Sequence, residues 1–134
     1  KIMDSVFVEF GIEPGSWAYV DGSGLTRYDY ISPQILVKIL EGMYKSDIKN
    51  VWINALPISG VDGTLRRRMI GTAAEKKVFA KTGTISNVRG LSGYTTTASD
   101  ENIVFSFLVN GHLLSSKDTE RITDSILELI CAYK

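Results

Sequence analysis

The stretch Val78-Phe79-Ala80-Lys81-Thr82-Gly83-Thr84 changes from apolar to polar residues within a segment that predicts a β-strand over residues 76–84. Its first three residues form a short apolar run, which is typical of a buried strand. Two more strand-like stretches follow at residues 89–97 and 103–110, and Asp100-Glu101-Asn102 predicts the hairpin turn that joins them. Because strands joined by short turns pair antiparallel, this half of the chain predicts an antiparallel sheet.

Helical patterns lie on both sides of these strands. Apolar residues recur at helical spacing over residues 2–10, and Ser32 is suited to be the N-cap of a second helix that begins at Pro33. Residues 118–133 predict an amphipathic terminal helix packed on the sheet. We expect its buried stripe to consist of Ile122, Ile126, Leu129, Ile130 and Tyr133. The predicted class is therefore α+β, an antiparallel sheet flanked by helices.

Three shorter segments complete the predicted elements. Residues 17–20 form a short strand candidate, and residues 64–69 suggest a short basic helix. Residues 51–56 are apolar and fit either a short helix or an extended segment, because periodicity does not separate the two over so short a run.

Composition excludes several classes of protein. A length of 134 residues predicts one domain or one piece of a domain. The formal net charge is +0, and no basic stripe lies among the aromatic residues, so nucleic-acid binding is disfavoured. One histidine, His112, and one cysteine, Cys131, do not make a zinc ligand set, and we expect neither a metal nor a cofactor.

The K-T-G residues have the chemistry of an acyl-transfer site. Lys81 would supply positive potential beside a nucleophile, and the hydroxyls of Thr82 and Thr84 could bind a substrate carboxylate. Gly83 has no side chain, so a substrate backbone could lie against the strand and add to it as another strand. A backbone N–H after the motif could donate to an oxyanion. By itself the tripeptide is a weak signal, because a surface strand with a lysine and a turn-forming glycine could contain the same three residues without any catalytic role.

Further sequence blocks make the signal specific. They are D-G-S-G-L-T-R at residues 21–27, L-P-I-S-G-V-D-G-T-L at 56–65, L-S-G-Y at 91–94 and F-S-F-L-V-N-G at 105–111. K-T-G is one of three signatures of the serine acyl-transferases that penicillin inhibits. In this order and spacing, the chain resembles the D-alanyl-D-alanine carboxypeptidase/endopeptidase family of type 4 low-molecular-mass penicillin-binding proteins. The resemblance extends over essentially all of residues 1–134, which we take as one segment of a penicillin-binding transpeptidase-like domain.

The resemblance implies a β-lactamase/transpeptidase-like fold and a serine peptidase that acts on the D-Ala-D-Ala end, or the D-amino-acid cross-link, of peptidoglycan stem peptides. Members form an acyl-enzyme and are acylated by β-lactams. Lys81, Thr82 and Gly83 match catalytic positions of the family, and Thr84 matches a substrate-binding position. Arg27 matches an arginine that can face an acidic substrate side chain, although an exposed loop arginine is an equal alternative, and Ser86 lies where side chains vary with substrate preference. An exported protein of the periplasm or cell envelope is implied, since peptidoglycan lies outside the cytoplasmic membrane.

The chain departs from the family pattern at two motifs. The family carries its nucleophilic S-x-x-K and its S-x-N before the D-G-S-G block, whereas this sequence has no S-x-N and has one S-x-x-K, at Ser46-Asp47-Ile48-Lys49. Ser46 ends a predicted helix in a polar stretch, so we interpret it as solvated rather than catalytic. We therefore expect a C-terminal segment that is inactive alone. The N-terminal part of the same enzyme would be its partner, and the sheet face which that part would cover is expected to promote self-association.

Two alternatives remain at this stage. An esterase with a Ser-His-Asp triad would need His112 as its base, but no G-x-S-x-G elbow occurs and His112 follows Asn110-Gly111 in a predicted turn, where an exposed histidine is expected. A non-catalytic cell-wall binding or scaffold module would keep the fold without the nucleophile. The intact block Lys81-Thr82-Gly83-Thr84 disfavours that module mildly, because sequence drift would be expected to erode it.

Overall fold

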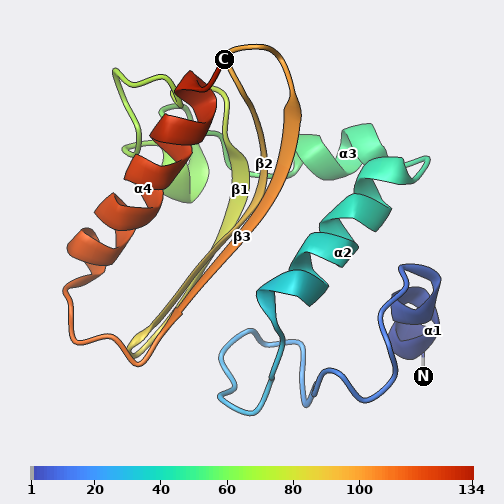
Figure 1. Cartoon of the computed structure of the whole chain (residues 1–134). Coiled ribbons are helices and arrows are strands. Elements are labelled where there is room, and N and C mark those ends of the chain that lie inside the picture. Colours follow the sequence, from blue (N-terminus) through green and yellow to red (C-terminus); the bar gives the residue numbers. More distant parts are fainter. Residues whose placement is uncertain (1) are drawn as a thin grey trace.

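The structure is a computed structural model that describes residues 2–134; Lys1 lies outside the described residues. Its elements are α1 (Ile2–Glu9), α2 (Pro33–Lys45), α3 (Lys49–Asn54), the 3-10 turn η1 (Gly63–Leu65), β1 (Phe79–Ile85), β2 (Val88–Thr96), β3 (Asn102–Asn110) and α4 (Ser116–Ala132). The three strands form one antiparallel sheet in the order β1-β2-β3. Figure 1 shows α4 against one face of this sheet, with α2 and α3 on the other side. The predicted α+β class is confirmed.

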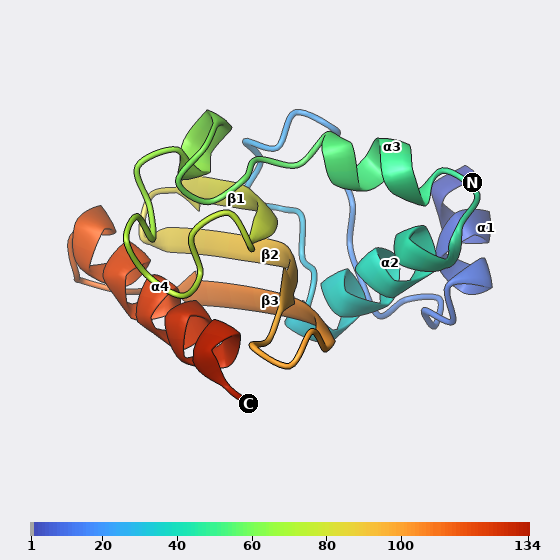
Figure 2. The same cartoon turned by 90° about the horizontal axis from the view of Figure 1, so that it is seen from above.

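The face of the sheet toward α4 holds the larger hydrophobic core. Ala80 of β1, Leu91 of β2 and Phe105 of β3 pack with Leu127 and Cys131 of α4, and all five are buried. The strands lie side by side beneath α4 when the molecule is seen from above (Figure 2). Strand residues spaced by two point to the same face, so β1 directs Ala80, Thr82 and Thr84 toward α4.

The predicted buried stripe of α4 is wrong for Ile122, Ile126, Leu129 and Tyr133, which are exposed, whereas Ile130 is partly buried and packs against the larger core. The buried residues are Thr119, Thr123, Leu127 and Cys131, which recur every four residues. A row at this spacing lies along one line of a helix, and the threonine hydroxyls can be buried because they donate to carbonyls one turn back, Thr119 to Ser115 and Thr123 to Glu120. The Thr95 hydroxyl and the Cys131 thiol, 2.9 Å apart, form a further hydrogen bond between the sheet and this row. Small side chains with satisfied polar groups therefore face the sheet in place of the larger isoleucines.

The outward face of α4 is apolar. Ile122 is 50% exposed, Ile126 39%, Leu129 73% and Tyr133 66%, and these side chains follow one another at helical spacing. Leu129, Ile130 and Tyr133 also border a groove with Ile103 of the edge strand β3. One exposed apolar surface thus lies on this helix. The sequence predicted such a surface on a sheet face, but α4 and α2 pack on the two faces of the sheet.

A second cluster joins α2 and α3 to the opposite face of the sheet. Its buried members are Leu40 of α2, Leu56, which follows α3, and Tyr94 of β2. The Tyr94 hydroxyl donates to the Leu40 carbonyl oxygen at 2.6 Å and accepts from Trp52 Nε1 at 3.0 Å. Burial raises the pKa of Tyr94, so its hydroxyl remains protonated as the donor that ties α2 to the strand.

Local signals placed the helix boundaries well. The Ser32 hydroxyl accepts from the Ile35 N–H at 3.3 Å, as expected of an N-cap with Pro33 in the first turn. Residues 49–54 are helical, which decides the alternative that the sequence left open for this segment. The predicted helix over residues 64–69 is limited to the 3-10 turn Gly63–Leu65.

Two predicted strand segments are shorter than expected. Residues 17–20 make only an isolated bridge, Ala18 to Tyr30. β1 begins at Phe79 instead of residue 76, because Lys76 adopts a positive φ of 63° and donates its N–H to the Ser59 carbonyl, which turns the chain before the strand. No helix among the described residues is long and apolar enough to cross a membrane.

Candidate active-site strand

The K-T-G residues lie on an edge strand. β1 pairs with β2 on its inner side, with Lys81 opposite Ser92 and Gly83 opposite Gly90. On the outer side, residues 57–59 contact only the start of the strand, where the Ala80 N–H donates to the Pro57 carbonyl at 3.0 Å. Backbone groups alternate between the two sides of a strand, so the N–H groups of Thr82 and Thr84 point the same way as that of Ala80, beyond the covering segment. Within the described residues, this half of β1 is open to strand addition.

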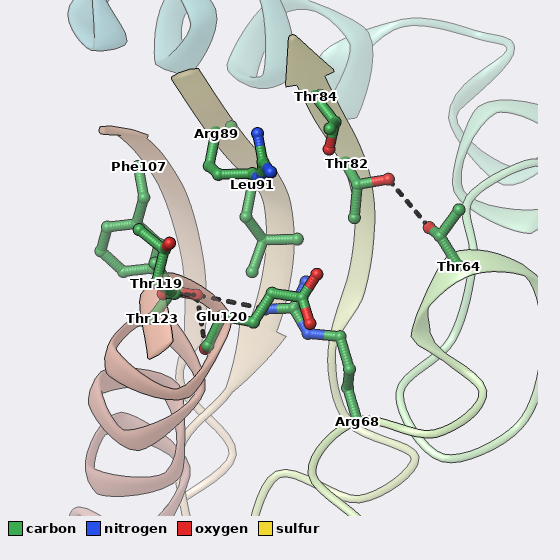
Figure 3. Close-up of a pocket in the computed structure, with 12 residues that line it drawn as sticks. Thr64, Arg68, Thr82, Thr84, Arg89, Leu91, Phe107, Thr119, Glu120 and Thr123 are labelled. Atoms are coloured by element: carbon green, nitrogen blue, oxygen red, sulfur yellow. Dashed lines mark hydrogen bonds between the residues drawn. The ribbon is translucent and has the colours of Figure 1, made fainter. Parts of the chain in front are cut away.

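Side chains of the motif separate onto the two faces of the sheet. Lys81 follows Phe79 on the face toward α2, and its ammonium reaches around to donate to the Thr82 carbonyl at 2.7 Å. Thr82 and Thr84 lie on the face toward α4 (Figure 3). The Thr82 hydroxyl donates to the Thr64 hydroxyl at 3.0 Å. A peptide strand added at this edge would thus lie near the Lys81 ammonium, near the Thr82 and Thr84 hydroxyls on one face, and along the outward N–H groups of β1.

Gly83 is not required by packing within the sheet. A Cβ at this position would lie 3.9 Å from the Gly90 Cα, an ordinary van der Waals distance, and no positive φ is recorded for it. Without a side chain, position 83 leaves the face of the strand clear beside Lys81.

Two serines that the sequence did not single out lie in the same row as Lys81. Ser92 is its cross-strand partner, Ser106 is the next partner across β3, and the two hydroxyls are 2.9 Å apart. They form a polar strip on the α2 face of the sheet, beside the lysine. In the sequence they belong to the blocks at residues 91–94 and 105–111, and Ser92 also lies in Gly90-Leu91-Ser92-Gly93, which lacks the final glycine of a G-x-S-x-G elbow.

A cleft lies between the sheet and the first half of α4 (Figure 3). Its volume is about 160 Å³. Its lining includes Thr82, Thr84, Arg89 and Leu91 from the strands, Thr64 and Arg68 from the preceding loop, and Glu120 and Thr123 from α4. The sequence indicated only Thr82, Thr84 and, through its backbone, Gly83, because the other residues come from distant segments.

The two arginines of the cleft differ in their partners. Arg68 is paired with Asp124, whose Oδ1 lies 2.5 Å from Arg68 Nη2, and it also donates to the Thr123 hydroxyl at 3.1 Å. Arg89 Nη1 donates to the carbonyls of Ile85 at 2.7 Å and Val88 at 2.8 Å, which are neutral groups. Asp124 compensates the charge of Arg68, whereas Arg89 has no ion-pair partner within residues 2–134.

Arg27 and Ser86, the other predicted substrate-binding residues, do not line this cleft. Arg27 is exposed in the loop between α1 and α2. In the same loop Asp21 accepts the Ser23 N–H at 2.8 Å, and hydrogen bonds from Ser23 lower the pKa of the Asp21 carboxyl. Ser86 is exposed at the tip of the β1–β2 turn, next to Asn87 with its positive φ of 59°.

The S-x-x-K string at residues 46–49 is engaged elsewhere. The Ser46 hydroxyl donates to the Met43 carbonyl at 2.8 Å at the end of α2, and the Lys49 ammonium lies 3.5 Å from the centre of the Tyr44 ring. These contacts hold each group in a local structural role.

His112 is half-buried in the loop between β3 and α4, whereas the sequence predicted an exposed histidine. Its Nδ1 lies 3.1 Å from the Leu114 carbonyl oxygen, and its Nε2 is screened from solvent without a hydrogen-bond partner among residues 2–134. The loop folds back on the ring, which a turn signal in the sequence does not indicate. An Nε2 that solvent cannot reach is poorly placed to act as the base of a Ser-His-Asp triad.

A helix-flanked antiparallel sheet with K-T-G on an edge strand is an arrangement typical of the serine acyl-transferases that penicillin inhibits. The chain belongs to the D-Ala-D-Ala carboxypeptidase 3 (S13) family, whose model matches residues 1–133. The resemblance stated from the sequence blocks is thereby confirmed.

Individual relatives support the same placement. The chain is 36% identical over 121 residues to the D-alanyl-D-alanine carboxypeptidase DacB of Haemophilus influenzae, covering 89% of this chain and 25% of that protein. It is 39% identical over 107 residues to a D-alanyl-D-alanine carboxypeptidase of an Actinomadura species, covering 76% and 20%. The crystal structure of penicillin-binding protein 4 from Haemophilus influenzae superposes with a TM-score of 0.84 at 30% identity, over 97% of this chain and 31% of that one. The chain thus spans about a quarter of the length of the curated relatives it matches.

Proposed function

We propose that this chain forms one side of the active-site cleft of a serine-type D-Ala-D-Ala carboxypeptidase/endopeptidase, which cleaves peptidoglycan stem peptides through an acyl-enzyme. The observation that carries the proposal is the K-T-G segment on an edge strand whose outer side is open beyond Ala80. Its family and the names of its relatives, which are D-alanyl-D-alanine carboxypeptidases, supply the substrate class.

The strand would bind the substrate by extending the sheet. The N–H groups of Thr82 and Thr84 point to the open edge, so a peptide carbonyl could accept from one of them, and the Thr84 N–H could stabilise the oxyanion of a tetrahedral intermediate. Lys81 lies near this edge, since its ammonium already contacts the Thr82 carbonyl. There it would attract the negative charge that develops as the scissile carbonyl is attacked.

The nucleophile would come from outside these 134 residues. Ser46 and Lys49 are tied to Met43 and Tyr44, away from any arrangement in which lysine activates serine. The remainder of a longer protein, matching the rest of its relatives, would provide the serine, its lysine and the other side of the cleft. We also propose that this protein is exported to the cell envelope, because that is where stem peptides lie.

Mass spectrometry after incubation with a penicillin tests whether the nucleophile lies outside these 134 residues. We expect the isolated 134-residue chain to gain no mass, and the full-length protein to gain one penicilloyl group. The same incubation with the Ser46→Ala chain is the matched control. A single adduct on the isolated chain that disappears in Ser46→Ala would place the nucleophile here and refute the proposal that the chain is inactive alone.

The apolar face of α4 leads to a prediction about association. In a longer protein the remaining segments would be the first candidates to cover Ile122, Ile126, Leu129 and Tyr133. In the isolated chain a second copy would bury the same residues, so we expect the sedimentation coefficient to rise with concentration. The Leu129→Glu substitution, at the most exposed of these positions, should weaken the association by placing a charge in the interface, while Lys117→Gln, at an exposed position of α4 outside the apolar face, serves as control. A strict monomer at high concentration would contradict this prediction.

A further inference from the structure

The block L-P-I-S-G-V-D-G-T-L at residues 56–65 folds beside β1 and ends next to the K-T-G residues. Pro57 accepts the Ala80 N–H at the start of the strand. Further along the block, the Thr64 hydroxyl accepts from the Thr82 hydroxyl at 3.0 Å (Figure 3). Both threonines line the cleft between the sheet and α4. The block thus places a hydroxyl partner beside the central residue of the motif.

The loop fixes the position of Thr64. Leu65, the next residue, is fully buried in the larger core. The preceding Gly63 has a positive φ of 52°, a conformation that favours glycine, where the chain enters η1. The Asp62 carboxylate accepts the Ile58 N–H at 2.8 Å and closes the turn before it. Thr64 therefore presents its hydroxyl from a constrained backbone, although its side chain is exposed.

The side chain of Thr82 depends more on its hydrogen bond. Thr82 is half-buried on the edge strand, beyond the segment that covers Ala80. The Lys81 ammonium donates to the Thr82 carbonyl, so it does not hold the hydroxyl. Within residues 2–134, Thr64 is the one hydrogen-bond partner of the Thr82 hydroxyl. A β-branched side chain occupies few χ1 rotamers, and this bond favours the rotamer that directs the hydroxyl toward Thr64.

The two hydroxyls can exchange the roles of donor and acceptor. A hydroxyl carries one donor and two acceptor lone pairs. The single Thr82 proton is directed at Thr64, so it cannot serve a substrate oxygen at the same time, whereas Thr64 uses only a lone pair in this bond. Rotation of the two O–H bonds reverses the pair, so that Thr64 donates to Thr82 and Thr82 donates to the substrate. The oxygens stay in place, and the Thr82 donor is strengthened because neighbouring hydrogen bonds polarise one another.

We propose that Thr64 is a positioning residue for the K-T-G threonine, which accepts from Thr82 in the free protein and donates to Thr82 when a substrate is bound. This inference rests on the proposed function and makes it more specific, since it assigns a role to the block at residues 56–65. Serine at position 64 would keep the hydroxyl and both roles. Valine has nearly the same shape but can neither accept nor donate, so Thr82 would lose its partner in both states.

The test measures the second-order rate of acylation by a penicillin in the full-length protein. We expect Thr64→Val to lower this rate by about fivefold, within the range for the net contribution of one neutral hydrogen bond, and Thr64→Ser to stay within about twofold of the unaltered protein. Thr82→Val removes the other hydroxyl, so adding Thr64→Val to it should change the rate by less than about twofold. Ser125→Ala is the control, because it removes an exposed hydroxyl of α4 that does not line the cleft, and it should leave the rate unchanged.

The double substitution separates this role from a structural one. If Thr64→Val acted by displacing the loop, it would slow acylation equally in the Thr82→Val background and lower the melting temperature, which we expect to be unchanged because Thr64 is exposed. Should Thr64→Val fail to fold, Thr64→Ala and its combination with Thr82→Val supply the same comparison. Equal slowing in both backgrounds, or a Thr64→Val rate close to the original, would overturn the inference and leave the proposed function standing. An unaltered full-length protein that penicillin does not acylate would overturn the proposed function and the inference with it.

Discussion

Replacing Lys81 by alanine in the full-length protein should slow acylation by penicillin by roughly a hundredfold or more, the range typical of losing one electrostatic contact to a transition state. Lys81 is exposed, and its ammonium lies at the Thr82 carbonyl, on the edge where the substrate is proposed to bind. Stopped-flow or gel-based measurement of the second-order acylation rate checks the expectation. The fold of the Lys81→Ala variant should be unaffected, because an exposed side chain contributes little to the core.

Controls make the Lys81 result specific. Lys81→Met retains the aliphatic stem and should lose nearly as much rate, since the charge is the property required. Lys45→Ala removes an exposed lysine at the end of α2 and should leave the rate unchanged. Acylation of Lys81→Ala within threefold of the original rate would show that this lysine is not part of the site.

Substituting Gly93 by alanine should lower the free energy of unfolding by about 3 kcal/mol, the upper range for overpacking a core. A Cβ on Gly93 would lie 2.1 Å from the Phe79 carbonyl oxygen and 2.6 Å from the Ala80 Cα. Both are backbone atoms of β1, so relief requires the two strands to separate just before the K-T-G residues. The loss should therefore appear in stability and in the placement of Lys81 together.

Urea denaturation of the isolated chain measures this effect. Gly90→Ala is a control in the same strand, because the closest atom its Cβ would meet is Leu108 Cδ2 at 3.3 Å, on a side chain that can move. We expect that variant to lose clearly less stability than Gly93→Ala. Equal losses in the two variants would mean that the close approach of β2 to β1 does not constrain the edge strand.

The sequence was sufficient for features that depend on neighbouring residues. The strand over the K-T-G segment, the hairpin around Asp100, the Ser32 N-cap and the helix after Pro33 all follow from local chemistry, and each occurs in the structure within a few residues of the predicted bounds. The family also followed from the sequence, because its blocks are short, ordered and specific. Each of these signals is complete within a few consecutive residues.

The candidate site was only partly accessible from the sequence. Lys81, Thr82 and Thr84 were identified from the motif, but Arg68 and Arg89 were not, since no local pattern distinguishes them from surface arginines. Arg68 meets Asp124 across 56 positions of the chain, and Arg89 lies in the cleft because of its register opposite Thr84. Such residues become recognisable only when the strands and α4 are placed together.

The buried face of α4 shows why the tertiary structure had to decide the rest. Hydrophobic periodicity favoured Ile122, Ile126 and Leu129 for the core, yet the sheet is contacted by the row that contains Thr119, Thr123 and Leu127. Periodicity states that a helix has an apolar side, but it does not state which surface that side meets. The sequence alone therefore determined the elements, the motif strand and the family. Only packing determined which face of the sheet Lys81 shares with α2 and that α4 closes a cleft on the threonine side, because both depend on contacts between residues far apart in the chain.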